Sequence, residues 1–156
     1  MKIYSINTIT NEILEFEAKN FASLSGNYNS GDWREATQEE VKTVVLEKSK
    51  KNKLAEIENN KKDFIYSPIE YNGSTFINSQ ISSANLQGAY TFSDEPINWL
   101  DINGDTVVLS KIQIEELANL IIAHRASCYF QESSKLKEVA LATTIEEVDL
   151  IDENFN

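Results

Sequence analysis

The run from Ser110 to Val139 constrains this chain more than any other stretch, because it has the pattern of one long amphipathic helix. Ser110 and Gln113 have the spacing of a capping box, in which each side chain binds the backbone N–H of the other residue. Residues suited to a buried face then recur at helical spacing: Ile114, Leu117, Leu120, Ile121, His124, Cys128 and Val139. Such a stripe predicts a helix of roughly 45 Å with one buried side. The rest of a small domain must pack along it or extend beyond it.

The composition is that of an ordinary globular chain of modest size. Its 156 residues suggest one domain with at most a small appendage, and 41% of them are hydrophobic. No apolar run approaches the roughly 20 residues that a membrane-crossing helix needs. The first six residues lack the apolar segment of a secretion signal, and a single cysteine cannot form an internal disulfide. We therefore expect synthesis and folding in a reducing cytoplasm.

The chain is strongly acidic, with 25 acidic and 14 basic side chains and a net charge of -11. Such a charge argues against binding to a nucleic-acid backbone or to an anionic membrane. The basic run at 47–62, which holds six lysines, is the exception. It fits either a nucleic-acid patch or the solvated face of a helix. Because the run has no interleaved aromatic residues and no glycine loop, we favour the solvated face.

The first 36 residues predict a small β-structure followed by a loop. Two strand-like runs, Ile3–Ile6 and Ile13–Phe16, flank a polar connection and predict a hairpin at 1–17. Glycine, serine and asparagine then interrupt any periodic pattern, so residues 18–36 are predicted to form a loop. An isolated hairpin is only marginally stable in water, so this one must dock on another part of the chain or on a partner.

Two interpretations compete for Trp33, which closes this loop. In the first, the indole packs against the start of the next helix as a hydrophobic staple does. In the second, it is an exposed anchor for a partner, because Trp is over-represented among binding hot spots. We favour packing, and we keep Tyr4, Phe16 and Trp33 as the candidate partner-binding residues of the N-terminal segment.

Residues 37–62 predict a helix that connects two bodies. Thr37 and Glu40 have the spacing of a capping box at its start. Two apolar patches follow, at Val41–Val45 and Leu54–Ile57, and the lysine-rich segment between them is polar. A helix with a polar middle is poorly buried there and often bridges separate bodies. We therefore divide the chain into a docking arm at 1–36, a connector helix at 37–62 and a C-terminal α+β domain at 63–156.

Local signals in the C-terminal part predict two hairpins before the long helix. An extended segment is expected at 64–66, because Pro68 excludes a helix there. Two strand-like pairs then flank Asn-Gly dipeptides at 72–73 and 103–104, the strongest sequence signal for a two-residue hairpin turn. The exit strand of the second hairpin leads directly into Ser110 and the long helix.

Capping signals predict two further helices. Asn78 is expected to cap a short helix at 79–91, and a capping box at Thr144 opens a last short helix. The final residues of the chain are expected to fray. The predicted fold is α+β, with small antiparallel β-hairpins packed on the long C-terminal helix, and with the connector helix leading to an N-terminal β-hairpin arm.

The order of features between about residues 53 and 152 carries a family resemblance. A helix rich in Ala, Glu and Lys is followed in turn by Tyr71–Phe76, Ser79–Ser83, Ile97–Trp99, Asp101–Leu109, Ile122–Ala126, Cys128, Leu136–Lys137 and Ala142–Glu147. In order and spacing these segments resemble the DUF4376 family, a domain of unknown function that is associated with phage tails. The hairpin that precedes them, with Asp32–Thr37, resembles the front end of small tail-fibre-linked proteins.

This resemblance implies a bacteriophage or prophage tail setting, and it supplies no catalytic residues and no cofactor. We therefore expect a non-enzymatic structural and interaction protein of the virion tail, a tail fibre or baseplate accessory component made in the host cytoplasm. Its expected partners are phage tail or tail fibre proteins, in an oligomeric assembly. The alternatives are a tail fibre assembly chaperone and an uncharacterised enzyme or metal-binding protein.

Two groups of residues have the types and spacing of possible metal ligands. His124 and Cys128 lie four residues apart on one helix face, where they are either two metal ligands or core residues. The segment Asp101–Asp105 has the residue types of a calcium loop, but it is shorter than the 12-residue EF-hand pattern and lacks the closing glutamate. We favour core packing for the first and a plain turn for the second. Nucleophile and phosphate-loop motifs are missing from the sequence, so we predict no catalytic residues.

Overall fold

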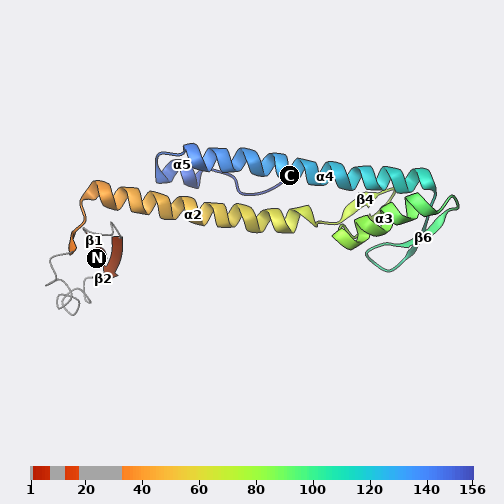
Figure 1. The fold of residues 1–156 in the computed structure, drawn as a ribbon, viewed down its shortest axis with the longest axis horizontal. Coiled ribbons are helices and arrows are strands. Elements are labelled where there is room, and N and C mark those ends of the chain that lie inside the picture. The colour runs from red at the N-terminus through yellow and green to blue at the C-terminus, as the bar shows by residue number, and fades with distance from the viewer. Residues whose placement is uncertain (1, 8–12, 18–32) are drawn as a thin grey trace.

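Two long helices that lie side by side form the body of the protein. The computed structural model describes residues 2–7, 13–17 and 33–156. Helix α2 (Gln38–Ile65) and helix α4 (Lys111–Leu141) run antiparallel over much of their length, as Figure 1 shows. Each opens with the predicted capping box, at Thr37 and at Ser110. The fold is α+β, as the sequence predicted, and its long C-terminal helix is confirmed.

A three-stranded sheet precedes α2, at one end of the molecule (Figure 1). Strands β1 (Lys2–Asn7) and β2 (Ile13–Glu17) form the predicted antiparallel hairpin. A third strand, β3 (Trp33–Glu35), pairs with the other edge of β1. The prediction of a loop up to residue 36 was therefore wrong for these three residues. Strand β3 is too short to show an alternating pattern, and the exposed edge of β1 determines its pairing.

Two hairpins and a short helix form the opposite end, residues 66–122, which we call the distal body. Strands β4 (Ile69–Tyr71) and β5 (Ser74–Phe76) flank the predicted two-residue turn. Asn72 and Gly73 both have positive φ, of 49° and 81°. A turn of type I′ requires that backbone at both central residues, so this prediction is confirmed.

The second hairpin, β6 (Ile97–Leu100) and β7 (Thr106–Leu109), has a longer connection than the sequence predicted. Asp101 accounts for the difference. Its Oδ1 accepts hydrogen bonds of 2.8 Å from the backbone N–H groups of Asn103 and Asp105. Because the carboxylate already organises the backbone, the loop closes over five residues, and only Gly104 has positive φ there. Within this loop the carboxylate therefore serves the turn, in agreement with the interpretation we favoured.

Helix α3 (Gln80–Phe92) lies beside α4, and its start differs from the prediction. The N-cap is Ser79, whose side chain accepts from the backbone N–H of Ser82. Asn78 is buried instead, and its amide Nδ2 donates to the backbone carbonyl of Ile65 at 2.8 Å. The local capping signal was therefore misread by one residue, because a contact distant in sequence uses the Asn78 side chain.

Two hydrophobic clusters divide the interior. The distal cluster joins the hairpins and α3 to the first half of α4, through Ile69, Tyr71, Phe76, Leu86, Leu109, Ile114, Leu117 and Ile121. The proximal cluster joins α2 to the second half of α4 and the C-terminus, through Ile57, Ile65, Cys128, Val139, Ile151 and Phe155. Leu120, which the predicted stripe included, is 43% exposed. The buried positions of this part of α4 are Ile114, Leu117, Ile121 and Cys128, so Leu120 lies at the edge of the stripe and only part of its side chain is covered.

The middle and the end of α2 also differ from the predictions. Lys53, in the segment expected to be poorly buried, is only 9% exposed, and its Nζ lies 2.9 Å from Oε2 of Glu153. Leu54 beside it is 38% exposed, although the sequence placed it in an apolar patch. The segment expected to be extended at 64–66 continues the helix, which ends at Ile65. Pro68 thus stops the helix three residues later than we predicted.

The C-terminal residues fold back along the two helices instead of fraying. Helix α5 (Ile145–Asp149) begins at the predicted capping box of Thr144. Phe155 is then buried in the proximal cluster, and the backbone of Asn156 exchanges hydrogen bonds with the side chain of Gln131. We call α2, α4, α5 and this tail together the rod. Burial of Phe155 explains why the prediction of a frayed end was wrong.

Candidate interaction site

The three predicted partner-binding residues lie in one sheet. Tyr4 is on the central strand β1, Phe16 on β2 and Trp33 on β3. The register places Phe16 opposite Ile3 and Trp33 opposite Asn7. Tyr4 is half-buried. The side chains of Phe16 and Trp33 lie outside the described residues, so the choice between packing and docking for Trp33 stays open.

A polar junction joins this sheet to the rod. The Arg34 guanidinium donates from Nη1 to Oε2 of Glu40 at 2.9 Å and from Nη2 to Oε1 at 2.5 Å. Glu40 also accepts from the backbone N–H of Thr37 at 2.8 Å, within the capping box of α2. The backbone N–H of Ala36 donates to the carbonyl of Tyr4. One carboxylate thus connects the last strand of the sheet to the first turn of the helix.

These contacts change the protonation of Glu40. The hydrogen bond from Arg34 and then the backbone N–H of Thr37 lower the pKa of the Glu40 carboxyl from 4.5 to about 2. A lowered pKa stabilises the folded state at any pH above the unfolded value near 4.5. That stabilisation is lost as the pH falls from about 4.5 through about 2. The junction is therefore intact at neutral pH and weakens only in acid.

The structure places His124 and Cys128 against the end of α2. Nε2 of His124 donates to the backbone carbonyl of Phe64 at 2.7 Å, and the ring lies 4.4 Å from the Phe64 ring between centroids. Sγ of Cys128 is buried 4.0 Å from the carbonyl of Lys61. Both side chains thus contact backbone carbonyls in the last turns of α2, and the Phe64 carbonyl also accepts from the backbone N–H of Ser67. Among the described residues, no group of three or more His, Cys, Asp or Glu is placed to hold a metal ion.

No sequence pattern predicted the polar junction where α2, α3 and α4 meet. Nη2 of Arg125 donates to Oδ1 of Asn78 at 2.9 Å, and its guanidinium lies over the ring of Tyr66 at 5.9 Å. Asn78 in turn donates to the carbonyl of Ile65. Nε of Arg125 is buried and has no hydrogen-bond partner among the described residues. Arg125, the only lysine or arginine between Lys111 and Lys135, is therefore held beside the start of α3.

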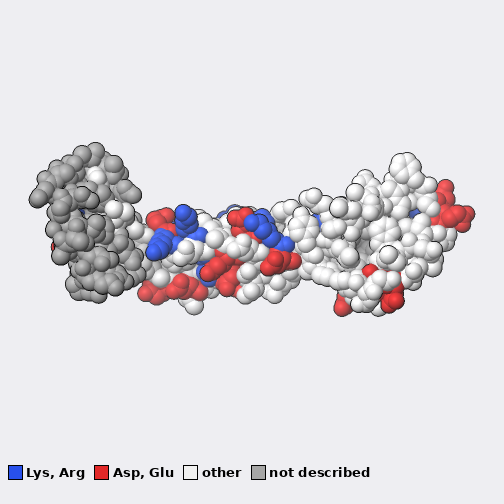
Figure 2. Space-filling view, turned by 90° about the horizontal axis from the view of Figure 1, so that it is seen from below, with Lys and Arg blue, Asp and Glu red and all other residues white. Residues whose placement is uncertain are grey.

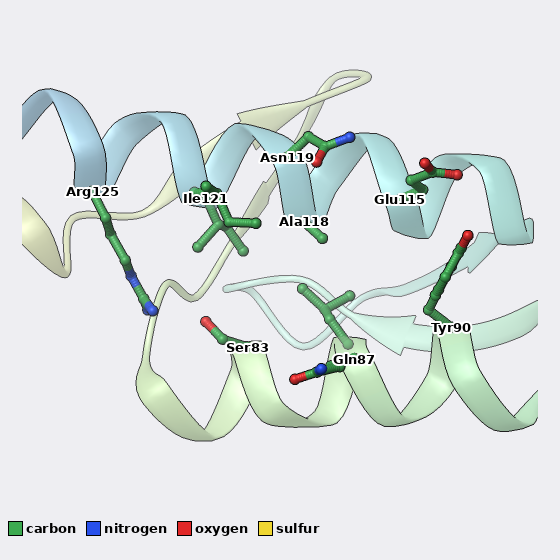
Figure 3. A pocket seen from close by; sticks show the side chains of 10 residues that line it. Ser83, Gln87, Tyr90, Glu115, Ala118, Asn119, Ile121 and Arg125 are labelled. Atoms are coloured by element: carbon green, nitrogen blue, oxygen red, sulfur yellow. The ribbon is translucent and has the colours of Figure 1, made fainter.

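A groove runs between α3 and α4 beside this junction, as Figure 3 shows. It encloses about 380 Å³ and has apolar side chains in its lining: Leu86, Ala118, Ile121 and Ile122. Arg125 lies at one end of the groove, and Glu115 and Tyr90 lie at the other. The signal that could have indicated it is the uncharged run at 71–93, which supplies all of α3.

Charged side chains are distributed unevenly between the rod and the distal body. Figure 2 shows Lys, Arg, Asp and Glu side chains gathered over the rod, whereas the distal body presents mainly uncharged side chains on the face in view. No residue between Lys62 and Lys111 is basic. The charged side chains of the rod stay hydrated, because removing them from water is costly. Covering an uncharged surface has a smaller desolvation cost. The helices that the structure describes include none with the length and apolarity of a membrane span.

A family model described as a domain of unknown function, DUF4376, matches residues 48–152. The chain belongs to the DUF4376 family. The DUF4376 match begins within α2 and ends just beyond α5, so it covers most of the rod and all of the distal body, and it leaves out the N-terminal sheet, the start of α2 and the end of the tail. No curated protein and no solved structure matches the chain. The predicted domain boundaries at 36/37 and 62/63 stay predictions.

Proposed function

We propose that this DUF4376 chain is a non-enzymatic structural and interaction protein of a bacteriophage tail, a tail fibre or baseplate accessory component. The resemblance of its front end and of its DUF4376 features to tail-associated proteins supports the tail setting. The proposed partners are tail or tail fibre proteins in an oligomeric assembly, and the proposed location is the virion tail.

The observation that best supports docking is the position of the N-terminal sheet. It sits at one end of the molecule (Figure 1), and β3 leads through two residues into α2. In the part of the chain that the structure describes, β2 and β3 pair with β1 alone, so each is an edge strand. Edge strands present N–H and C=O groups to which a partner can add a strand. The sheet that carries Tyr4, Phe16 and Trp33 is thus the proposed docking element.

A truncation tests this division of roles. A chain that begins at Thr37 keeps the capping box of α2 and both hydrophobic clusters. We expect it to fold, with the helical circular dichroism of the full chain, and to be missing from purified particles when it replaces the full chain during phage growth. Mass spectrometry of the purified virions measures incorporation.

A matched control and two outcomes make the test decisive. Leu150→Ser changes a side chain that is 85% exposed and lies outside the N-terminal sheet, and it should leave incorporation unchanged. Incorporation of the truncated chain at the normal level would refute docking through the sheet. A full-length chain that promotes fibre assembly but never remains in purified particles would instead favour the assembly chaperone.

A further inference from the structure

The outer side of the α3–α4 pair has the composition of a buried surface. Residues 117–130 of α4 contain no acidic residue and no lysine, and the imidazole of His124 and the guanidinium of Arg125 are both held by the polar contacts described above. The inward positions, such as Ile121, pack in the distal cluster. The outward positions include Ile122, which is 64% exposed, and Phe130, which is 80% exposed. A helix that is apolar on all sides is normally buried on all sides.

Helix α3 extends this surface across the groove. All 13 of its residues are uncharged, yet only Leu86 is buried. Its side chains on the groove, including Ser83, Gln87 and Tyr90, lie across from Ala118 and Asn119 of α4 in Figure 3. The hairpins lie behind this layer, so the groove opens on the side away from them. Two antiparallel helices thus present one continuous face.

The charges at the ends of the groove are opposite in sign. Arg125 lies beside the start of α3, and Glu115 lies near its end (Figure 3). Near Glu115, Lys111 is already paired with Asp94 at 2.7 Å, so its charge is compensated. For Glu115, no ion pair is found among the described residues. A copy of the same face turned end to end brings each Glu115 towards the Arg125 of the other copy.

We propose that this face, formed by α3 and by residues 112–130 of α4, packs against the same face of a second copy of the chain. The two copies are antiparallel, and the twofold axis passes near Asn119, midway between Glu115 and Arg125. Such a contact is isologous, because each residue pair occurs twice. It builds a four-helix layer over the groove. The proposal does not depend on the phage-tail assignment.

The size of the face agrees with a small stable interface. At 1.5 Å per residue, α3 is about 20 Å long and residues 112–130 of α4 are about 28 Å long. Two helices packed roughly 10 Å apart make the face about 20 Å wide, so its footprint is about 500 Å². Specific interfaces begin near 600 Å² of accessible surface per partner, and projecting side chains raise the accessible area above the footprint. We therefore expect a dimer whose population depends on concentration.

Analytical ultracentrifugation of the full chain over a concentration series tests the proposal. We expect the wild type to shift from monomer to dimer, and Ile122→Lys to remain monomeric while it keeps the circular dichroism of the wild type. Ile122 is mostly exposed, so the lysine is tolerated in the monomer. The matched control is Leu150→Lys, another exposed apolar side chain, which should dimerise as the wild type does. A monomeric wild type at every accessible concentration would overturn the proposal.

A cross-link tests the position of the axis. Under mild oxidation, Asn119→Cys should form a disulfide-linked dimer in high yield, because each copy places this residue next to its own counterpart. Leu141→Cys, at the far end of α4 and 79% exposed, should not. The native Cys128 is buried and should stay reduced in both variants. Dimers that persist in Ile122→Lys, or that cross-link through Leu141→Cys and not through Asn119→Cys, would assign the contact to another surface and refute the proposal.

Discussion

The Arg125 guanidinium donates a hydrogen bond of 2.9 Å to the side chain of Asn78, which is 1% exposed. The same Asn78 side chain donates to the carbonyl of Ile65 at the end of α2. One amide therefore connects the end of the first long helix, the segment before α3 and the middle of α4. Its two bonds serve partners that lie 13 and 47 positions away in the sequence.

Replacement of Asn78 by alanine should lower the free energy of unfolding by about 2 kcal/mol, because it leaves a buried carbonyl and a guanidinium without a partner. Urea unfolding at one low protein concentration measures the loss. Asn85→Ala, an exposed change within α3, should stay within about 0.5 kcal/mol of the wild type. Equal effects at the two positions would show that the junction contributes nothing specific.

Two leucines of α4 should respond very differently to truncation. Leu117 is fully buried in the distal cluster, so Leu117→Ala should lower the free energy of unfolding by about 3 kcal/mol through lost burial and a cavity. Leu120→Ala removes a side chain that is 43% exposed and should lower it by less than about 1 kcal/mol. Denaturant unfolding of the two variants checks the difference. A large loss at Leu120 would place it in the core, as the sequence pattern had suggested.

Local rules predicted the parts of this fold that local chemistry determines. Both long helices begin at a capping box, and the β4–β5 hairpin turns at Asn72–Gly73. These signals could be recognised because they need only a few neighbouring residues. The errors arose where a distant partner decides. Asn78 serves Ile65 and not its own helix, and strand β3 forms only because β1 offers an edge. Burial of Phe155 likewise depends on its cluster with residues of α2 and α4, which are distant in the sequence.

The same contrast between local signals and distant contacts applies to the candidate sites. The sequence could propose Tyr4, Phe16 and Trp33, but it could not predict that one sheet would unite them, because β3 was not recognised. The α3–α4 groove could not be predicted from local patterns, because its two sides lie far apart in the sequence and only the lack of charge at 71–93 indicates it.

Two glycines should give opposite results when they are replaced by alanine. Gly104 has φ of 86°, a backbone that an L residue adopts at a cost of about 1 to 2 kcal/mol, so Gly104→Ala should destabilise the chain by that amount. Gly88 is helical and has no atom within 4 Å of an added Cβ, so Gly88→Ala should stabilise it by up to about 1 kcal/mol. Thermal unfolding of the monomer distinguishes the signs. Destabilisation by Gly88→Ala would mean that something approaches α3 closely there.

Acid should weaken the attachment of the C-terminal tail. The hydrogen bond from Lys53 lowers the pKa of the Glu153 carboxyl below its usual value of 4.5. The stabilisation is therefore fully present above pH 4.5 and is lost as the pH falls through the lowered pKa. We expect the melting temperature to decrease below pH 4.5 in the wild type, and to decrease less steeply in Glu153→Gln, which cannot titrate there. Parallel acid profiles of the two proteins would rule out this carboxylate as a contributor.

The antiparallel pairing of α2 and α4 fixes the distance between the two ends of the molecule. The N-terminal sheet lies beyond one end of the pair and the α3–α4 groove at the other (Figure 1), so the number of helical turns sets the spacing between them. Removal of seven residues from α2 and from the facing part of α4 would shorten that spacing by about 10 Å and keep the inward faces aligned. Removal of seven residues from one helix alone would shift its inward-facing residues relative to those of the other helix.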